Sequence, residues 1–178
     1  RAHDSLGILS TLKHFPGHGS SQSDSHKGFT DVSDSWQPRE LEPFRQLLQG
    51  DHRVGLMTAH VFNRQLDSIY PATLSERVIK HYIRDEWNFK GLVFSDDLQM
   101  KAVHALFDFD TIIRRSLEAG VDVLVFGNNL EYDMDIPRRA VMTIVDLVES
   151  GNVPVERLVA SYDRIVGAKK GIAEGVKD

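Results

Sequence analysis

The chain has 178 residues, no cysteine and a formal net charge of −5 at pH 7. The absence of cysteine excludes disulfides, thiolate zinc sites and a cysteine nucleophile, and the acidic balance argues against nucleic acid as the main partner. A hydrophobic share of 41% and a charged share of 26% are ordinary for a globular protein, so we expect a folded domain with a sizeable core.

Short apolar runs alternate along the chain with amphipathic segments. In chain order, the predicted strands cover residues 7–15, 53–60, 91–95 and 121–127, and the predicted helices cover residues 38–49, 75–87, 110–119, 137–149 and 154–168. Near-continuous apolar runs of this length are typical of strands buried on both faces of a parallel sheet. The alternation predicts an α/β fold of four βα units and a terminal helix, with right-handed crossovers. Ser75 is a candidate N-cap of the second helix.

Unusual polar residues follow all four predicted strands, at the edge where parallel α/β folds hold their active sites. Asp96 directly follows the third apolar run, where a carboxylate can act as a nucleophile, a general base or a metal ligand. The alternative is that Asp96 or Asp97 caps the next helix. We expect Asp97 to have the supporting or capping role.

The segment after the first predicted strand runs from Lys13 to Gly19 and is rich in glycine and histidine. Lys13 can direct its ammonium group at a substrate oxygen or carboxylate, and His14 can donate a hydrogen bond. The alternative is a glycine-rich corner with incidental polar residues. His60 ends the second predicted strand and could line the same cleft, or it could be a structural histidine with satisfied hydrogen bonds.

Asp24 and His26 lie two residues apart in the long loop that follows. A carboxylate that accepts a hydrogen bond from an imidazole selects its tautomer and raises its basicity, which is the logic of an acid–base dyad. A solvated turn is the alternative. The same loop also permits a metal-dependent hydrolase, in which His14, His18 and His26 supply imidazoles and Asp24 supplies a carboxylate. Pro16 and Gly17 oppose the helix that would place His14 and His18 on one face.

The motifs at residues 13–19, 24–26 and 94–100 together resemble those of family 3 glycoside hydrolases. More narrowly, they resemble the bacterial β-N-acetylhexosaminidases that act on cell-wall muropeptides in peptidoglycan recycling. Residues 57–60 and 71–75 fit the same family, so the resemblance covers almost the whole chain. It implies a retaining glycosidase without a cofactor or a catalytic metal, which removes terminal β-linked N-acetylglucosamine from muropeptides or chitooligosaccharides.

The resemblance also implies roles for individual residues. Asp96 is expected to be the nucleophile that forms a glycosyl-enzyme, with His26 as the acid/base and Asp24 as its dyad partner. The residues expected to bind the sugar are Lys13, His14 and His60. Retaining hydrolysis needs a carboxylate nucleophile and a group that first gives and then takes a proton, and the histidine pKa of about 6.5 suits that exchange near neutral pH.

The family fold is a (β/α)₈ barrel, and the resemblance assigns the four βα units of this chain to strands five to eight. Residues 1–178 are then expected to be the C-terminal half of one catalytic domain, and the lack of an initiator Met agrees with a fragment. Open strand edges and an uncovered sheet face predict that the missing N-terminal half, or a second copy, is a partner. A non-catalytic half-barrel is the remaining alternative.

The surroundings of the protein are also expected from sequence. No run of about 18 apolar residues is present, so we expect no membrane partner. The first residues do not resemble a signal peptide, and the absence of cysteine suits a reducing compartment, so we expect a cytoplasmic protein.

Overall fold

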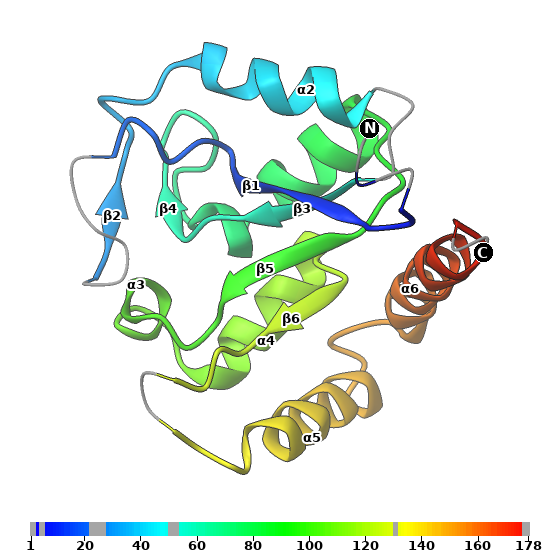
Figure 1. The fold of residues 1–178 in the computed structure, drawn as a ribbon. Helices are drawn as coiled ribbons and strands as arrows, with labels where there is room; N and C mark the ends of the chain where they lie inside the picture. The colour runs from blue at the N-terminus through cyan, green and yellow to red at the C-terminus, as the bar shows by residue number, and fades with distance from the viewer. Residues whose placement is uncertain (1–2, 4–5, 22–27, 50–53, 130–131, 176–178) are drawn as a thin grey trace.

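Four parallel strands form the central sheet of the protein. The computed structural model describes residues 3, 6–21, 28–49, 54–129 and 132–175 (Figure 1). The sheet order is β1–β3–β5–β6, formed by Ser10–Phe15, Val54–Thr58, Val93–Asp97 and Val123–Val125. The prediction of an α/β fold with a parallel sheet is therefore confirmed. All four strand arrows in Figure 1 point toward one edge of the sheet, which is the edge at the carboxyl ends of the strands.

The strand boundaries differ from those predicted. The first strand begins at Ser10 rather than at residue 7, because Gly7 has a positive φ of 67° and the amides of Leu6 and Ile8 both turn back to donate to the carbonyl of His3. The third strand is shifted toward the C-terminus and includes Asp96 and Asp97, which were expected to follow it.

Burial on both faces was predicted for every strand, and this is wrong for β1 and β6. In β1, exposed residues alternate with partly buried ones up to Phe15, and all of β6 is partly exposed. In Figure 1 the helices η3 and α4 lie behind the sheet. Alternating burial is typical of a strand with one packed face and one open face. The described part of the chain therefore leaves one face of the sheet partly uncovered at the two outer strands, β1 and β6.

All five predicted helical segments are helical. The first divides into a 3₁₀ turn, η1 (Pro38–Leu41), and a short α-helix, α2 (Glu42–Leu48), and the second is a π-helix, η3 (Arg77–Glu86). The others are α4 (Phe109–Ala119), α5 (Ile136–Glu149) and α6 (Val155–Gly175). Two short helical elements were not predicted: η2 (Ala72–Leu74) and α3 (Lys101–His104). The N-cap of η3 is Glu76, one residue after the predicted Ser75, although the Ser75 hydroxyl accepts a 3.1 Å hydrogen bond from the amide of Val78.

A second, two-stranded sheet joins the two long loops. Here β2 (Thr30–Asp31) pairs in parallel with β4 (Val61–Phe62), and the amide of Val32 adds a 2.9 Å bond to the carbonyl of Phe62. In Figure 1 these strands lie beyond the arrowheads of the main sheet, on the same side as α3. Residues 30–32 and 61–62 of the segments that follow β1 and β3 therefore form regular structure at the edge where the candidate residues lie.

The core lies between the sheet and the helices behind it. Leu56 and Val93 of the sheet share a buried cluster with Ile79 and Ile83 of η3. Burial of each such side chain stabilises the fold by about 1.5–3 kcal/mol. Helix α4 packs in turn against α5, where Ile113 is completely buried. Among the described helices, none has the length and apolar character required to cross a membrane.

Candidate functional site

The carboxyl end of β1 carries the first candidate residues. Between Leu12 and Phe15 the pairing of β1 with β3 shifts by one residue, so the strand is bulged at Lys13 and His14. The Lys13 side chain is exposed and His14 is partly buried, and the peptide bond between them is cis. Bulges redirect side chains and occur often beside active sites. The structure thus places the predicted sugar-binding pair in a bulge at the carboxyl end of β1.

The carboxyl end of β5 has a matching irregularity. Between Phe94 and Asp97 the pairing with β6 shifts by one residue, and Asp96 lies within this bulge. Its side chain is partly exposed, and Oδ1 accepts a 2.9 Å hydrogen bond from the amide of Asp97. The next helix has Met100 as its N-cap, with no side-chain capping bond. The capping alternative for these carboxylates is therefore not what the structure shows, and Asp96 remains a partly exposed carboxylate at the edge.

Asp97 has the supporting role that was expected of it, although not as a helix cap. Its Oδ1 accepts hydrogen bonds from the amide of Gln99 at 3.0 Å and from the amide of Gly127 at 2.9 Å. An added Cβ at Gly127 would overlap Oδ2 of Asp97, so glycine is required for this close approach. Gln99 extends the link, because its Oε1 accepts from the amide of Asn128 at 2.5 Å. These contacts attach the end of β5 to the segment after β6.

His60 connects β3 to the same group. Its side chain is fully buried, and Nε2 lies 2.9 Å from the carbonyl oxygen of Asp97. Burial lowers the pKa of the His60 imidazole, and it outweighs the opposing effects of the nearby Asp96 and Asp97. The ring is therefore held against the backbone of Asp97, and the contact with a sugar that was expected of His60 stays a prediction.

Buried contacts hold the turn after β1 in place. Gly17 has a φ of +120°, and a Cβ there would lie 2.7 Å from Oε2 of Glu40 and 3.2 Å from Nε1 of Trp36. The indole of Trp36 is buried and donates a 2.9 Å hydrogen bond to the carbonyl of Pro16. Pro16–Gly17 therefore forms a tight turn, as the sequence suggested, rather than part of a helix.

The predicted acid–base dyad, Asp24 and His26, lies outside the described residues. The predicted metal site is affected in the same way, since it combines these two residues with His14 and His18, whose ring centroids are 6.2 Å apart. Within the ranges that the structure describes, no group of three or more histidine, aspartate or glutamate side chains is arranged to hold a metal ion. The dyad and the metal site both remain predictions.

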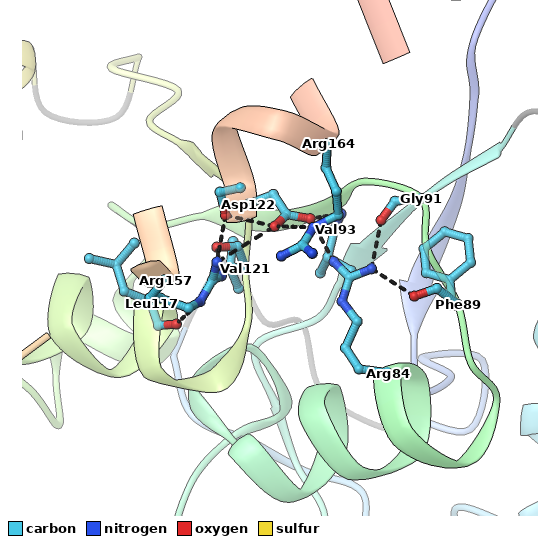
Figure 2. Close-up of polar contacts among 10 residues, drawn as sticks. Arg84, Phe89, Gly91, Val93, Leu117, Val121, Asp122, Arg157 and Arg164 are labelled. Carbon is cyan, nitrogen blue, oxygen red and sulfur yellow. Dashed lines mark hydrogen bonds and ion pairs between the residues drawn. The ribbon is translucent and has the colours of Figure 1, made fainter. Parts of the chain in front are cut away.

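A buried charge cluster that was not predicted from the sequence lies at the opposite edge of the sheet, at the amino ends of the strands (Figure 2). The carboxylate of Asp122 is completely buried, and its Oδ2 accepts from Arg84 at 2.6 Å and from the amide of Val93 at 3.0 Å. Its Oδ1 accepts from Ser161 at 2.7 Å and from Arg164 at 3.0 Å. One carboxylate thus joins the start of β5 to η3 and α6.

The cluster holds more positive than negative charge. Arg157 lies 3.8 Å from the Asp122 carboxylate and donates to the carbonyls of Leu117 and Val121. Burial is the largest cause that lowers the pKa of Arg84, to about 10, and it also lowers the pKa of Arg157. The position of this cluster at the amino ends of the strands indicates a role in stability rather than in chemistry.

Comparisons with known proteins identify the family. The sequence profile described as "Glycosyl hydrolase family 3 N terminal domain" matches residues 1–168. A "Beta-hexosaminidase" of Haemophilus influenzae strain PittEE is 40% identical over 129 residues, which are 70% of this chain and 36% of that protein.

Solved structures agree with the sequence match. A glycoside hydrolase family 3 β-N-acetylglucosaminidase from Paenibacillus sp. superposes with a TM-score of 0.85 at 30% identity, over 97% of this chain and 32% of that one. Zinc-bound CbsA from Thermotoga neapolitana gives a TM-score of 0.84 at 31% identity, over 96% of this chain and 36% of that one. The chain spans about a third of the length of each of these three relatives. With the family profile matched over nearly all of its residues, the chain belongs to glycosyl hydrolase family 3.

Proposed function

We propose that this chain carries the nucleophile of a retaining glycoside hydrolase that removes terminal β-linked N-acetylglucosamine, with Asp96 as that nucleophile. The observation that carries the proposal is a partly exposed carboxylate in the bulged end of β5, within a chain of family 3. The names of two relatives support the sugar specificity, since one is a "Beta-hexosaminidase" and the other a β-N-acetylglucosaminidase.

In the first proposed step, a carboxylate oxygen of Asp96 attacks the anomeric carbon. A new bond forms between this carbon and the carboxylate, while the bond to the leaving oxygen breaks and its electron pair stays on that oxygen. His26 gives a proton to the leaving oxygen. The negative charge of Asp96 also stabilises the oxocarbenium-like transition state.

In the second step, water attacks the same carbon and releases Asp96 as a carboxylate. The neutral His26 takes a proton from the attacking water, so acid and base roles alternate on one group. The proposed part of Asp24 is to accept a hydrogen bond from the imidazole, which selects its tautomer.

Lys13 and His14 are the proposed sugar-binding residues. They lie at the bulged end of β1, and β1 is joined to β5 through β3. The carboxyl ends of parallel strands meet at one edge, so side chains from both bulges can reach a single sugar ring. The exposure of Lys13 leaves its ammonium group accessible to a hydroxyl of the ring.

The wider setting is part of the same proposal. Muropeptide fragments or chitooligosaccharides are the proposed substrates, in a cytoplasmic protein. The four strands are proposed to be strands five to eight of a (β/α)₈ barrel, which other residues of a longer protein or a second copy complete. The partly uncovered face of β1 and β6 supports this idea, because such a face needs a cover.

The test is Asp96→Asn in the protein as its gene encodes it, assayed on an aryl N-acetyl-β-glucosaminide. We expect a loss of at least about a thousand-fold in kcat, because the nucleophile cannot be replaced by an amide. The matched control is Asp85→Asn, which removes an exposed carboxylate that pairs only loosely with His81 and should leave kcat unchanged. Turnover by Asp96→Asn equal to that of the control would show that Asp96 is not the nucleophile.

A further inference from the structure

Packing alone does not explain why a polar side chain, that of His60, is buried in this protein. Its side chain has no exposed surface, and Nε2 lies 2.9 Å from the carbonyl oxygen of Asp97. A carbonyl oxygen only accepts, so Nε2 carries the proton and Nδ1 is the bare nitrogen of the neutral ring. Among the described residues, no group bonds to the buried Nδ1.

Burial of such a nitrogen is unfavourable. Buried polar atoms are normally hydrogen-bonded, and an imidazole with one unsatisfied nitrogen is a poorer filler than an apolar side chain of similar size. A histidine at position 60 is therefore best explained by the bond that its Nε2–H makes. That bond is to the residue directly after Asp96.

Regular strand pairing does not hold the end of β5, which accepts this bond. The bulge in β5 displaces residues 95 and 96 from regular pairing with β6, so other contacts must orient them. The Asp97 carbonyl accepts from His60 and also from the amide of Met100 at 3.0 Å. The amide of Asp97 in turn donates to Oδ1 of Asp96 at 2.9 Å. The orientation of the Asp97 backbone is thereby coupled directly to the Asp96 carboxylate.

We infer that His60 is a positioning residue, which acts through the Asp97 carbonyl to hold the bulged end of β5 and so sets the direction of the Asp96 carboxylate. This inference rests on the proposed role of Asp96 as the nucleophile. It gives the buried histidine a part in the reaction without contact with the sugar.

The surroundings of His60 favour the neutral ring that this role requires. Burial lowers its pKa, and His104 lowers it further, whereas the carboxylates of Asp96 and Asp97 oppose the change. A charged imidazolium at this place would attract the Asp96 carboxylate and compete with its attack on the sugar. The neutral ring holds the backbone and leaves the charge of Asp96 uncompensated.

The experiment compares two replacements of His60 by the rate at which the glycosyl-enzyme forms. His60→Leu fills the space without a donor, and His60→Gln keeps an N–H near the position of Nε2. The readout is the pre-steady-state burst with an activated aryl glycoside, on variants shown to be folded by circular dichroism. His81→Leu, at an exposed site on η3, is the control and should match the wild type.

We expect His60→Leu to slow the burst by about ten-fold or more with KM changed by less than about three-fold, because misplaced reacting groups lower kcat rather than binding. His60→Gln should recover most of the rate. A wild-type burst in folded His60→Leu, or a His60→Gln no faster than His60→Leu, would overturn the inference. If His60→Leu does not fold, His60→Asn replaces it, since its shorter amide cannot reach the Asp97 carbonyl.

The inference and the proposed function fail in different ways. If Asp96→Asn abolishes turnover while His60→Leu keeps the wild-type burst, only the positioning role fails. If Asp96→Asn remains active, the assignment of the nucleophile fails, and the positioning role fails with it.

Discussion

Replacement of Asp122 with asparagine is the sharpest test of how the buried charge cluster stabilises the fold. This basal cluster consists of Asp122 with Arg84, Arg157 and Arg164. The carboxylate is completely buried, and each of its oxygens accepts two hydrogen bonds, from Arg84 and the Val93 amide on one side and from Ser161 and Arg164 on the other. Asparagine keeps one acceptor oxygen. Its amide nitrogen would face two donors, and the arginines would lose their shared counter-charge.

The expected size of the effect follows from the burial of the partners. Loss of one partner from a buried ion pair destabilises a protein by about 3–5 kcal/mol. The side chains of Arg84 and Arg164 are 14% and 27% exposed, so water partly solvates the charges that remain. We therefore expect a loss near the lower limit, about 3 kcal/mol in the free energy of unfolding. Arg164→Leu should lower it by much less, since two arginines would still serve one carboxylate.

The assay is urea unfolding followed by circular dichroism at pH 7. Asp85→Asn is the control, because its exposed pair with His81 should contribute less than about 0.5 kcal/mol. If Asp122→Asn lowers the free energy of unfolding by less than about 1 kcal/mol, the idea that this carboxylate holds the basal cluster together is wrong.

Further predictions concern pH, packing and metal. The pKa of His60 is lowered from 6.5 in the folded protein, so the unfolded chain binds the proton more readily. Between pH 7.5 and pH 5.5 the wild type should therefore lose up to about 1.4 kcal/mol more of its free energy of unfolding than His60→Gln loses. Equal losses in urea titrations at the two pH values would contradict this. Gly127→Ala should displace the Asp97 carboxylate and lower kcat about ten-fold. Gly167→Ala is the control, because no atom lies near an added Cβ there, and it should leave kcat unchanged. Equal kcat values for the two variants would count against the close packing of Gly127 on Asp97. Activity should survive EDTA, and a loss that zinc reverses would support the metal-dependent alternative instead.

The sequence predicted the order of strands and helices well because that order depends on local patterns. Apolar runs bounded by Gly and Pro are strong signals, and each of the four gave a strand. The boundaries were less certain, since the start of β1 depends on the positive φ of Gly7. A period of 3.6 residues also does not distinguish an α-helix from the π-helix found at η3.

The candidate site was predicted in part. The position of Asp96 at the carboxyl edge of the sheet was predicted from its place after an apolar run. The two bulges could not be predicted, because they depend on pairing between strands far apart in the chain. The same is true of the contact between His60 and the Asp97 carbonyl, which joins residues 37 positions apart.

The basal cluster illustrates a signal that was present in the sequence. Asp122 is a single acidic residue within the apolar run 121–126, and an aspartate is almost never buried there without partners. A buried partner could therefore have been inferred. Its arginines could not, because Arg84, Arg157 and Arg164 come from η3 and α6 and meet only in the folded chain.

The central claim is that Asp96 becomes covalently attached to the sugar. The direct measurement is to incubate the protein, as its gene encodes it, with 5-fluoro-N-acetylglucosaminyl fluoride, which forms the glycosyl-enzyme and hydrolyses slowly. Peptide mass spectrometry then locates the label. The account predicts one fluorosugar per chain on the peptide that contains Asp96, and no label in Asp96→Asn. A label on another residue, or turnover of natural substrate without any covalent adduct, would contradict it.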